Sequence, residues 1–214
     1  MNPSPAAVEI AVFARAPVPG QAKTRLAPRL GFDAAARLQS WLTWRALERA
    51  TAVPGARVCL WTAGEPGHPL WQELAAALNI EVRSQVGGDL GARMAHAFST
   101  TLADKSGPML LIGTDCPAQT PLDLIDAIES LKRADAVIQP ALDGGYVLIG
   151  LNRPCSELFD GIAWSTASVA GSTRRRARSA RLDLAEIQPL PDLDLPADLD
   201  AALAAGWVPP QAWA

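Results

Sequence analysis

The most constraining feature of this sequence is a short apolar run, residues 109–112, followed at once by Gly113, Thr114, Asp115, Cys116 and Pro117. Such a run is typical of a strand that is buried on both faces of a parallel sheet. Proline lacks a backbone N–H donor, so Pro117 ends the strand. Asp115 is therefore expected just beyond the carboxyl end of a strand, where open α/β sheets bind ligands. The alternative is that Asp115 only accepts hydrogen bonds from loop amides.

Strand and helix patterns alternate along the rest of the chain. Thr120 is a suitable N-cap and Pro121 suits the first helical position, so a helix is expected directly after the central loop. The alternation predicts an α/β fold with right-handed crossovers and a mainly parallel sheet, in one domain spanning residues 1–214. Further strands are expected at residues 8–13, 57–62, 80–83, 136–139, 147–151 and 186–190. Further helices are expected from an Asp33 cap to residue 53, at 68–78, from about Gly91, from a cap at Ser165 or Thr166, and from Pro196.

Composition excludes several classes of protein. A net charge of -3 argues against a chain whose main partner is nucleic acid. No apolar run approaches the ~20 residues of a membrane span, and no basic segment leads into an apolar core near Met1, so a cytoplasmic protein is expected. Three scattered cysteines and two histidines indicate neither a disulfide framework nor a zinc site.

A basic loop follows the first predicted strand. Residues 14–28 contain three prolines, Gly20 and the cations Arg15, Lys23 and Arg25. The prolines reduce the entropy lost on ordering, and Gly20 lets backbone amides approach a ligand closely. Lys23 and Arg25 combine a point charge with a planar fork, which suits neighbouring phosphate oxygens. The loop does not match the P-loop pattern, and an ordinary solvated loop is the alternative.

A glycine-rich loop follows the third predicted strand. It contains Gly88, Asp89, Gly91 and Arg93, and a helix is expected to begin near Gly91. The glycines permit close approach of a base or sugar, and the helix dipole points at the same place. A simple chain reversal with a solvent-facing Arg93 is the alternative.

Further carboxylates follow later strands. Asp143 precedes Gly144, Gly145 and the single tyrosine, Tyr146, in a segment that also suits a tight turn. Asp192 and Asp194 precede a predicted helix, although one of them could serve only as its cap. Clustered carboxylates repel unless a cation joins them, so a hard Mg²⁺ or Mn²⁺ ion bound together with phosphate oxygens is expected.

Five segments resemble the bacterial rSAM/selenodomain-associated glycosyltransferase-like family: residues 12–26, 88–91, 113–117, 143–146 and 164–166. The resemblance spans about residues 8 to 200 and implies a GT-A fold, the three-layer α/β/α architecture of nucleotide-diphospho-sugar transferases. The Lys23-Thr24-Arg25 loop is also similar to 2-phospholactate guanylyltransferases and molybdenum-cofactor nucleotidyltransferases. That similarity implies Asp115 as the principal metal ligand and Asp194 as a second one. The single aspartate at 115 departs from the Asp-x-Asp motif of glycosyltransferases.

The sequence therefore favours a metal-dependent enzyme that transfers a sugar from a nucleotide-diphospho-sugar to an unknown acceptor. One alternative is nucleotidyl transfer from a nucleoside triphosphate to a phosphorylated small molecule. Another is a non-catalytic nucleotide sensor. The expected catalytic residues are Lys23, Arg25, Asp115 and Asp143. The expected donor-binding residues are Arg15, Gly20, Lys23, Arg25, Gly88, Asp89, Gly91 and Arg93.

Overall fold

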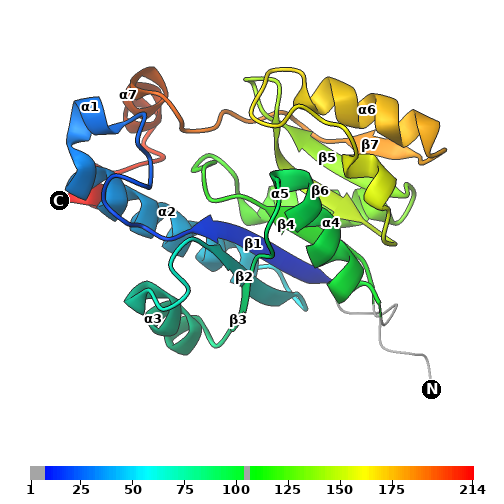
Figure 1. Cartoon of the computed structure of the whole chain (residues 1–214), viewed down its shortest axis with the longest axis horizontal. Helices are drawn as coiled ribbons and strands as arrows, with labels where there is room; N and C mark the ends of the chain where they lie inside the picture. The colour runs from blue at the N-terminus through cyan, green and yellow to red at the C-terminus, as the bar shows by residue number, and fades with distance from the viewer. Residues whose placement is uncertain (1–7, 104–106) are drawn as a thin grey trace.

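The computed structural model describes residues 8–103 and 107–214 (Figure 1). The segment near Met1 that carried the expectation on targeting lies outside this range. Within the described residues, seven strands form one sheet in the order β3-β2-β1-β4-β6-β5-β7. Strand β6 runs antiparallel to both of its neighbours, and the other pairings are parallel. The predicted α/β fold with a mainly parallel sheet is confirmed. The strands are β1 (Glu9–Arg15), β2 (Arg57–Ala63), β3 (Glu81–Ser84), β4 (Met109–Ile112), β5 (Ala136–Pro140), β6 (Tyr146–Leu151) and β7 (Leu184–Glu186).

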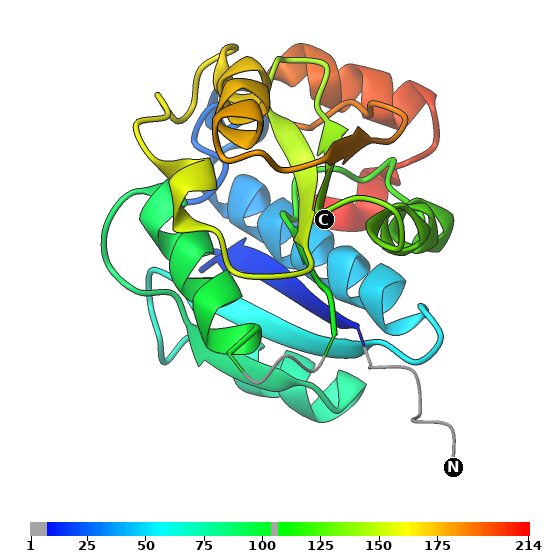
Figure 2. The ribbon, with the colours of Figure 1, turned by 90° about the vertical axis from the view of Figure 1, so that its right-hand side faces the viewer.

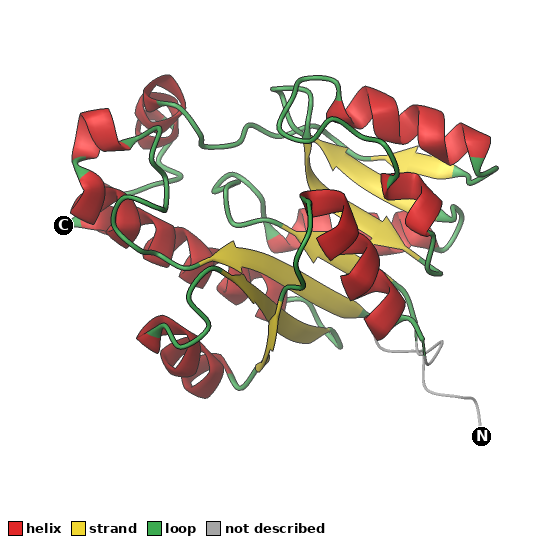
Figure 3. Ribbon diagram, in the orientation of Figure 1, coloured by secondary structure: helices red, strands yellow, loops and turns green. Residues whose placement is uncertain are grey.

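Helices cover both faces of the sheet (Figures 2 and 3). One apolar core joins the sheet to α2, α3 and α5, and a second joins it to α4 and α6. The α-helices are α1 (Ala27–Leu30), α2 (Phe32–Thr51), α3 (Pro69–Leu78), α4 (Leu90–Thr101), α5 (Pro121–Leu131), α6 (Val169–Ser179) and α7 (Pro196–Ala204). Two 3₁₀ helices, η1 (Ser156–Phe159) and η2 (Pro210–Trp213), complete the elements.

Strand β1 shows why the chain forms three layers. Its alternate residues point to opposite faces, so Ile10 and Val12 enter the first core whereas Ala11 and Phe13 enter the second. All four side chains are buried, as expected for a central strand of a parallel sheet.

The register of the central strands sets the position of the functional loops. Val12 of β1 pairs with Leu60 of β2 on one side and with Ile112 of β4 on the other. The strand order therefore reverses around β1, and the loops after β1 and β4 leave the same edge of the sheet. Open α/β sheets bind ligands at such a switch point.

Helix starts agree with the sequence in two cases. Thr120 and Asp123 form a reciprocal capping box at the start of α5, with Pro121 in the first turn. The Nδ1 atom of His68 accepts a hydrogen bond from the amide of Leu70 and caps α3.

Three boundaries were predicted wrongly. Gly31, not Asp33, is the N-cap of α2. Helix α6 begins at Val169 without a side-chain cap, because Ser165 adopts φ +62° and the Thr166 hydroxyl donates to the carbonyl of Ala163. Strand β7 ends at Glu186, and Leu190 makes only an isolated bridge to Ala141.

The segment after α7 completes a third apolar cluster. Val208 and Ala212 are buried there against Leu26, Leu38 and Leu42. This cluster fixes the basic loop after β1 to α2. No helix among the described residues is long and apolar enough to cross a membrane.

Candidate functional site

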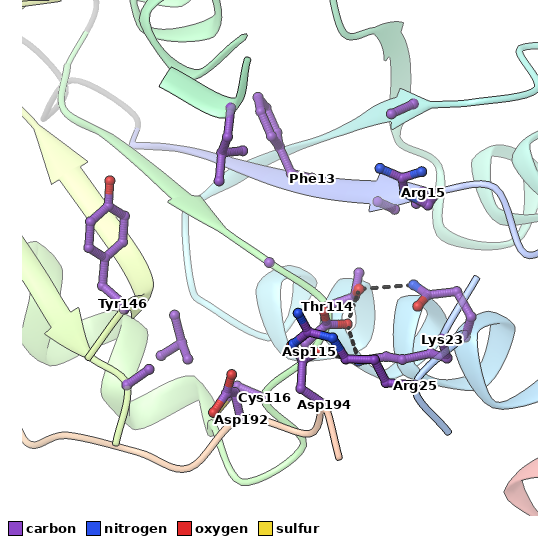
Figure 4. Close-up of a pocket in the computed structure, with 18 of the residues that line it drawn as sticks. Phe13, Arg15, Lys23, Arg25, Thr114, Asp115, Cys116, Tyr146, Asp192 and Asp194 are labelled. Atoms are coloured by element: carbon purple, nitrogen blue, oxygen red, sulfur yellow. Dashed lines mark hydrogen bonds and ion pairs between the residues drawn. The ribbon is translucent and has the colours of Figure 1, made fainter. Parts of the chain in front are cut away.

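A cavity of about 600 Å³ lies where the loops after β1, β4 and β7 meet (Figure 4). Its wall includes seven of the side chains expected from the sequence to bind donor or metal or to act in catalysis: Arg15, Lys23, Arg25, Arg93, Asp115, Asp143 and Asp194. These residues come from five parts of the chain: β1 with the loop after it, α4, and the loops after β4, β5 and β7. The topology therefore brings the predicted cations and carboxylates to one place.

Lys23 lies on the wall of this cavity with a side chain that is only 4% exposed. Its Nζ atom lies 2.9 Å from Oδ1 of Asp115 and 3.5 Å from Oδ1 of Asp194, and it also donates to the carbonyl of Leu193. The ammonium group of Lys23 is therefore an ion-pair partner of two carboxylates and a hydrogen-bond donor to one carbonyl. Lys23 adopts φ +47°, a left-handed conformation that costs a non-glycine residue energy and that these contacts maintain.

The other cations of the wall are more accessible. Nη1 of Arg25 lies 3.3 Å from Oδ2 of Asp194, while its side chain is 64% exposed. Nε of Arg93 donates to the carbonyl of Gly88 at 3.0 Å. Arg15, at the end of β1, is exposed and has no ion-pair or side-chain hydrogen-bond partner among the described residues. Arg15 and Arg25 are thus available to an anionic ligand.

Asp115 is supported by residues that sequence reasoning missed. The hydroxyl of Thr114 donates to Oδ1 of Asp115 at 3.1 Å, and the buried Gln39 donates to that hydroxyl at 3.0 Å. Gln39 lies on the apolar face of α2 beside Leu38 and Leu42. The sequence did contain a signal for this role of Gln39: it is a polar residue at helical spacing within an otherwise apolar helix face.

Asp194 is left free to face the cavity because another residue caps α7. Oδ2 of Asp198 accepts hydrogen bonds from the amides of Asp194, at 3.1 Å, and Leu195, at 2.7 Å. The alternative that Asp194 serves only as a cap is therefore wrong. Its side chain pairs with Lys23 and Arg25 instead.

Asp143 and Asp192 form the acidic side of the cavity wall. Burial raises the pKa of Asp192 to about 6, and the negative charges of Asp143 and Asp194 add to the effect. Oδ1 of Asp143 accepts the amide of Gly145 at 2.8 Å, so this residue also stabilises its own turn. Asp143 therefore stabilises its own turn and also lines the cavity.

Four predicted donor-binding residues lie outside the cavity wall: Gly20, Gly88, Asp89 and Gly91. Asp89 caps α4, since its Oδ1 accepts the amide of Ala92 at 2.8 Å. Gly91 packs under Trp164, where a Cβ atom would lie 2.7 Å from the indole ring. The glycine-rich loop therefore shapes the start of α4 and contributes only Leu90 and Arg93 to the wall.

Tyr146 closes the side of the cavity opposite Lys23 (Figure 4). Its ring makes an edge-on contact with Trp164 at 6.5 Å between centroids. Its hydroxyl lies 4.0 Å from Sδ of Met94, and burial raises the pKa of the phenol. Tyr146 therefore remains neutral and forms an aromatic wall.

The donor set of Asp115 and Asp194 fits a hard divalent cation. Both side chains are partly exposed, at 46% and 41%, and both face the same ammonium. No group of three or more His, Cys, Asp or Glu side chains suited to a metal occurs among the described residues. Mg²⁺ is commonly bound by one or two carboxylates and completed by substrate phosphates, which is the arrangement that this wall offers.

A protein-family model described as "Uncharacterized protein conserved in bacteria (DUF2064)" matches residues 46–166. A crystal structure of a "putative nucleotide-diphospho-sugar transferase" from Desulfovibrio desulfuricans G20 is 32% identical and superposes with a TM-score of 0.85. That match covers 93% of this chain and 87% of the other. No curated protein matches the chain.

Two more distant structures share the fold. The 4-diphosphocytidyl-2C-methyl-D-erythritol synthase of Anaerococcus prevotii DSM 20548 is 9% identical, with a TM-score of 0.63 over 96% of this chain and 100% of that one. A CMP:2-keto-3-deoxy-manno-octonic acid synthetase complexed with CTP is 13% identical, with a TM-score of 0.57 over 94% and 100%. At such identity these matches confirm the GT-A-like fold alone.

Proposed function

This chain belongs to the bacterial DUF2064 family, and we propose that it is a metal-dependent transferase whose donor is a nucleotide-diphospho-sugar. The observation that carries the proposal is the contact of one buried cation, Lys23, with both Asp115 and Asp194 on the wall of a cavity of about 600 Å³. A divalent ion and cationic side chains together neutralise the charge of a nucleotide diphosphate. This wall presents carboxylates that would bind such an ion beside cationic side chains.

The cationic side chains would hold the donor. Arg15 and Arg25 are accessible on the wall and would contact the diphosphate oxygens. The ammonium of Lys23 lies between the two carboxylates and would reduce the repulsion between Asp115, Asp194 and the incoming phosphates. Fixed cations of this kind stabilise the charge that develops on a leaving group.

Asp115 and Asp194 would hold Mg²⁺ or Mn²⁺. Carboxylate oxygens are the ligands that these hard ions prefer. When bound, the ion would supply Lewis-acid neutralisation of the leaving diphosphate. Such a role agrees with the partial exposure of both side chains toward the cavity.

Asp143 would orient the acceptor. It lines the cavity together with Tyr146. One of its oxygens is used by the amide of Gly145, which fixes the side chain and leaves the second oxygen for an acceptor hydroxyl.

Nucleotidyl transfer from a nucleoside triphosphate is the second candidate. Asp115 stands alone at the end of β4, without the paired aspartate of an Asp-x-Asp motif, and its partner Asp194 comes from the distant loop before α7. This arrangement favours a site in which phosphate oxygens supply most of the metal ligands. The attack would then occur at the α-phosphate, with release of pyrophosphate.

One assay separates these reactions. The protein is incubated with Mg²⁺ and either nucleotide sugars or nucleoside triphosphates, together with pools of hydroxyl and phosphate acceptors. Free nucleoside diphosphate from the sugars supports the first proposal, and pyrophosphate from the triphosphates supports the second. Tight nucleotide binding without either product, unchanged in Asp115→Asn, would indicate a nucleotide sensor and contradict both.

A further inference from the structure

A chain of buried hydrogen bonds connects helix α2 to Asp115. The side-chain amide of Gln39 donates to the hydroxyl of Thr114 at 3.0 Å and to the hydroxyl of Thr43 at 3.3 Å. The hydroxyl of Thr114 then donates to Oδ1 of Asp115 at 3.1 Å. Gln39, Thr43 and Thr114 are 4%, 0% and 4% exposed, so water does not compete for these bonds.

The direction of each hydrogen bond is determined by the number of hydrogens. Thr43 donates its only hydroxyl hydrogen to the backbone carbonyl of Gln39, at 2.8 Å. Thr43 can therefore only accept from the side chain of Gln39, which places the NH₂ end of that amide toward both threonines. Thr114 accepts from this NH₂ group, and its own hydrogen is left to point at Asp115.

The consequence for Asp115 is a difference between its two oxygens. Oδ1 accepts a hydrogen bond from the hydroxyl of Thr114 and forms an ion pair with Nζ of Lys23. Oδ2 has no hydrogen-bond or ion-pair partner among the described residues. A carboxylate held at one oxygen presents the other in a fixed direction. Outer hydrogen bonds of this kind orient metal ligands and tune their affinity.

We propose that Gln39 and Thr114 are positioning residues that hold Oδ1 of Asp115 and thereby direct Oδ2 into the cavity as a ligand for the divalent ion. This inference rests on the proposed function for the identity of the ion, but not for the orientation of Asp115. Thr43 shares the same buried cluster and makes no contact with Asp115 in these hydrogen bonds. It therefore provides a matched control.

The first experiment measures Mn²⁺ binding by electron paramagnetic resonance, using the metal alone and the full chain. Thr114→Val and Gln39→Met remove the hydrogen bonds at similar volume. Thr114→Val is expected to weaken Mn²⁺ binding about 10- to 100-fold, the usual range for an outer partner of a metal ligand. Gln39→Met is expected to weaken it by a smaller factor, because Thr114 keeps its hydroxyl. Thr114→Ser is expected to bind within about threefold of wild type, and Thr43→Val within about twofold.

The second experiment determines crystal structures of wild type and Thr114→Val and compares the Asp115 side chain. We expect the wild-type carboxylate in one orientation, with Oδ1 on Thr114, and a rotated or multiple orientation in the variant. An unchanged Asp115 in Thr114→Val would overturn the inference, as would equal loss of Mn²⁺ affinity in Thr43→Val. Absence of Mn²⁺ binding in wild type would contradict the proposed function, and the crystal structures would still decide the positioning role.

Discussion

The backbone amide of Leu193 donates a 2.7 Å hydrogen bond to the carbonyl oxygen of Asp115. The carbonyl of the same Leu193 accepts from Nζ of Lys23, so one residue joins the segment before α7 to both the loop after β4 and the basic loop. Leu193 is 1% exposed and packs in the third apolar cluster. The approach of Asp194 to Asp115 therefore depends on main-chain bonds and buried apolar contacts as well as on charge.

Asp115→Asn is expected to lower turnover roughly 100- to 1000-fold, the usual cost of losing one group that stabilises the transition state. The substitution keeps the shape but removes the charge that would bind the divalent ion. Steady-state kinetics at saturating Mg²⁺ measure the effect. Asp126→Asn, an exposed change on α5, is the control and should leave turnover unchanged. Full activity in Asp115→Asn would exclude Asp115 from the reaction.

Lys23→Met is expected to lower the free energy of unfolding by about 1–3 kcal/mol, because two carboxylates and a carbonyl lose the ammonium group that they share. In this variant Asp115 and Asp194 repel each other because no cation lies between them. Added Mg²⁺ should therefore restore part of the lost stability. Urea denaturation with and without Mg²⁺ measures both effects. Lys132→Met removes an exposed pair with Glu129 and should change stability by less than about 1 kcal/mol. Equal stability of the Lys23 and Lys132 variants, with no response to Mg²⁺, would contradict the role assigned to Lys23.

Gly144→Ala is expected to lower the free energy of unfolding by about 1–3 kcal/mol more than Gly55→Ala does, which is the usual cost of overpacking. Both glycines have positive φ, at +95° and +75°, so both pay for the left-handed conformation. Only at Gly144 would the new Cβ meet another atom, the carbonyl oxygen of Ala167 at 2.2 Å. Urea denaturation of the two variants separates the clash from the backbone strain. A similar loss of stability in both variants would show that the turn carrying Asp143 shifts to relieve the clash without an energetic cost.

Only Cys155 is expected to react with a thiol reagent in the folded protein. Burial raises the pKa of Cys59 and of Cys116 to about 12, and both side chains are nearly inaccessible. Cys155 is partly exposed, although burial and Glu157 also raise its pKa. Titration with dithionitrobenzoate at pH 8 should show one slow thiol in the native state and three in urea. Rapid labelling of Cys116, next to Asp115, would indicate that the central loop opens.

The fold was largely predictable because the spacing of apolar residues along the sequence shows which face of a strand or helix is buried. The apolar run of β4 and the Thr120-Pro121 start of α5 were recognisable without coordinates. The antiparallel pairing of β6 with β5 agrees with the hairpin turn that Asp143, Gly144 and Gly145 suggested, whereas the antiparallel pairing of β6 with β4 was not predicted. The late start of α6 was missed because Ser165 takes a left-handed conformation that overrides its preference for caps.

The charged half of the site was predictable for a related reason. Lys23, Asp115 and Asp194 each follow a strand or precede a helix, and parallel topology brings such positions together. The support of Asp115 by Gln39 was not predictable, because it depends on the rotation of α2 against the sheet. Likewise, nothing in the sequence showed that Asp198 rather than Asp194 caps α7.

The most direct measurement is a crystal structure of the protein with a nucleoside diphosphate and Mn²⁺, with anomalous scattering used to locate the metal. We expect one manganese peak in contact with Oδ2 of Asp115 and with Asp194, and the diphosphate beside Arg15 and Arg25. A nucleotide bound elsewhere, or a diphosphate in this cavity with no manganese at Asp115, would contradict the account.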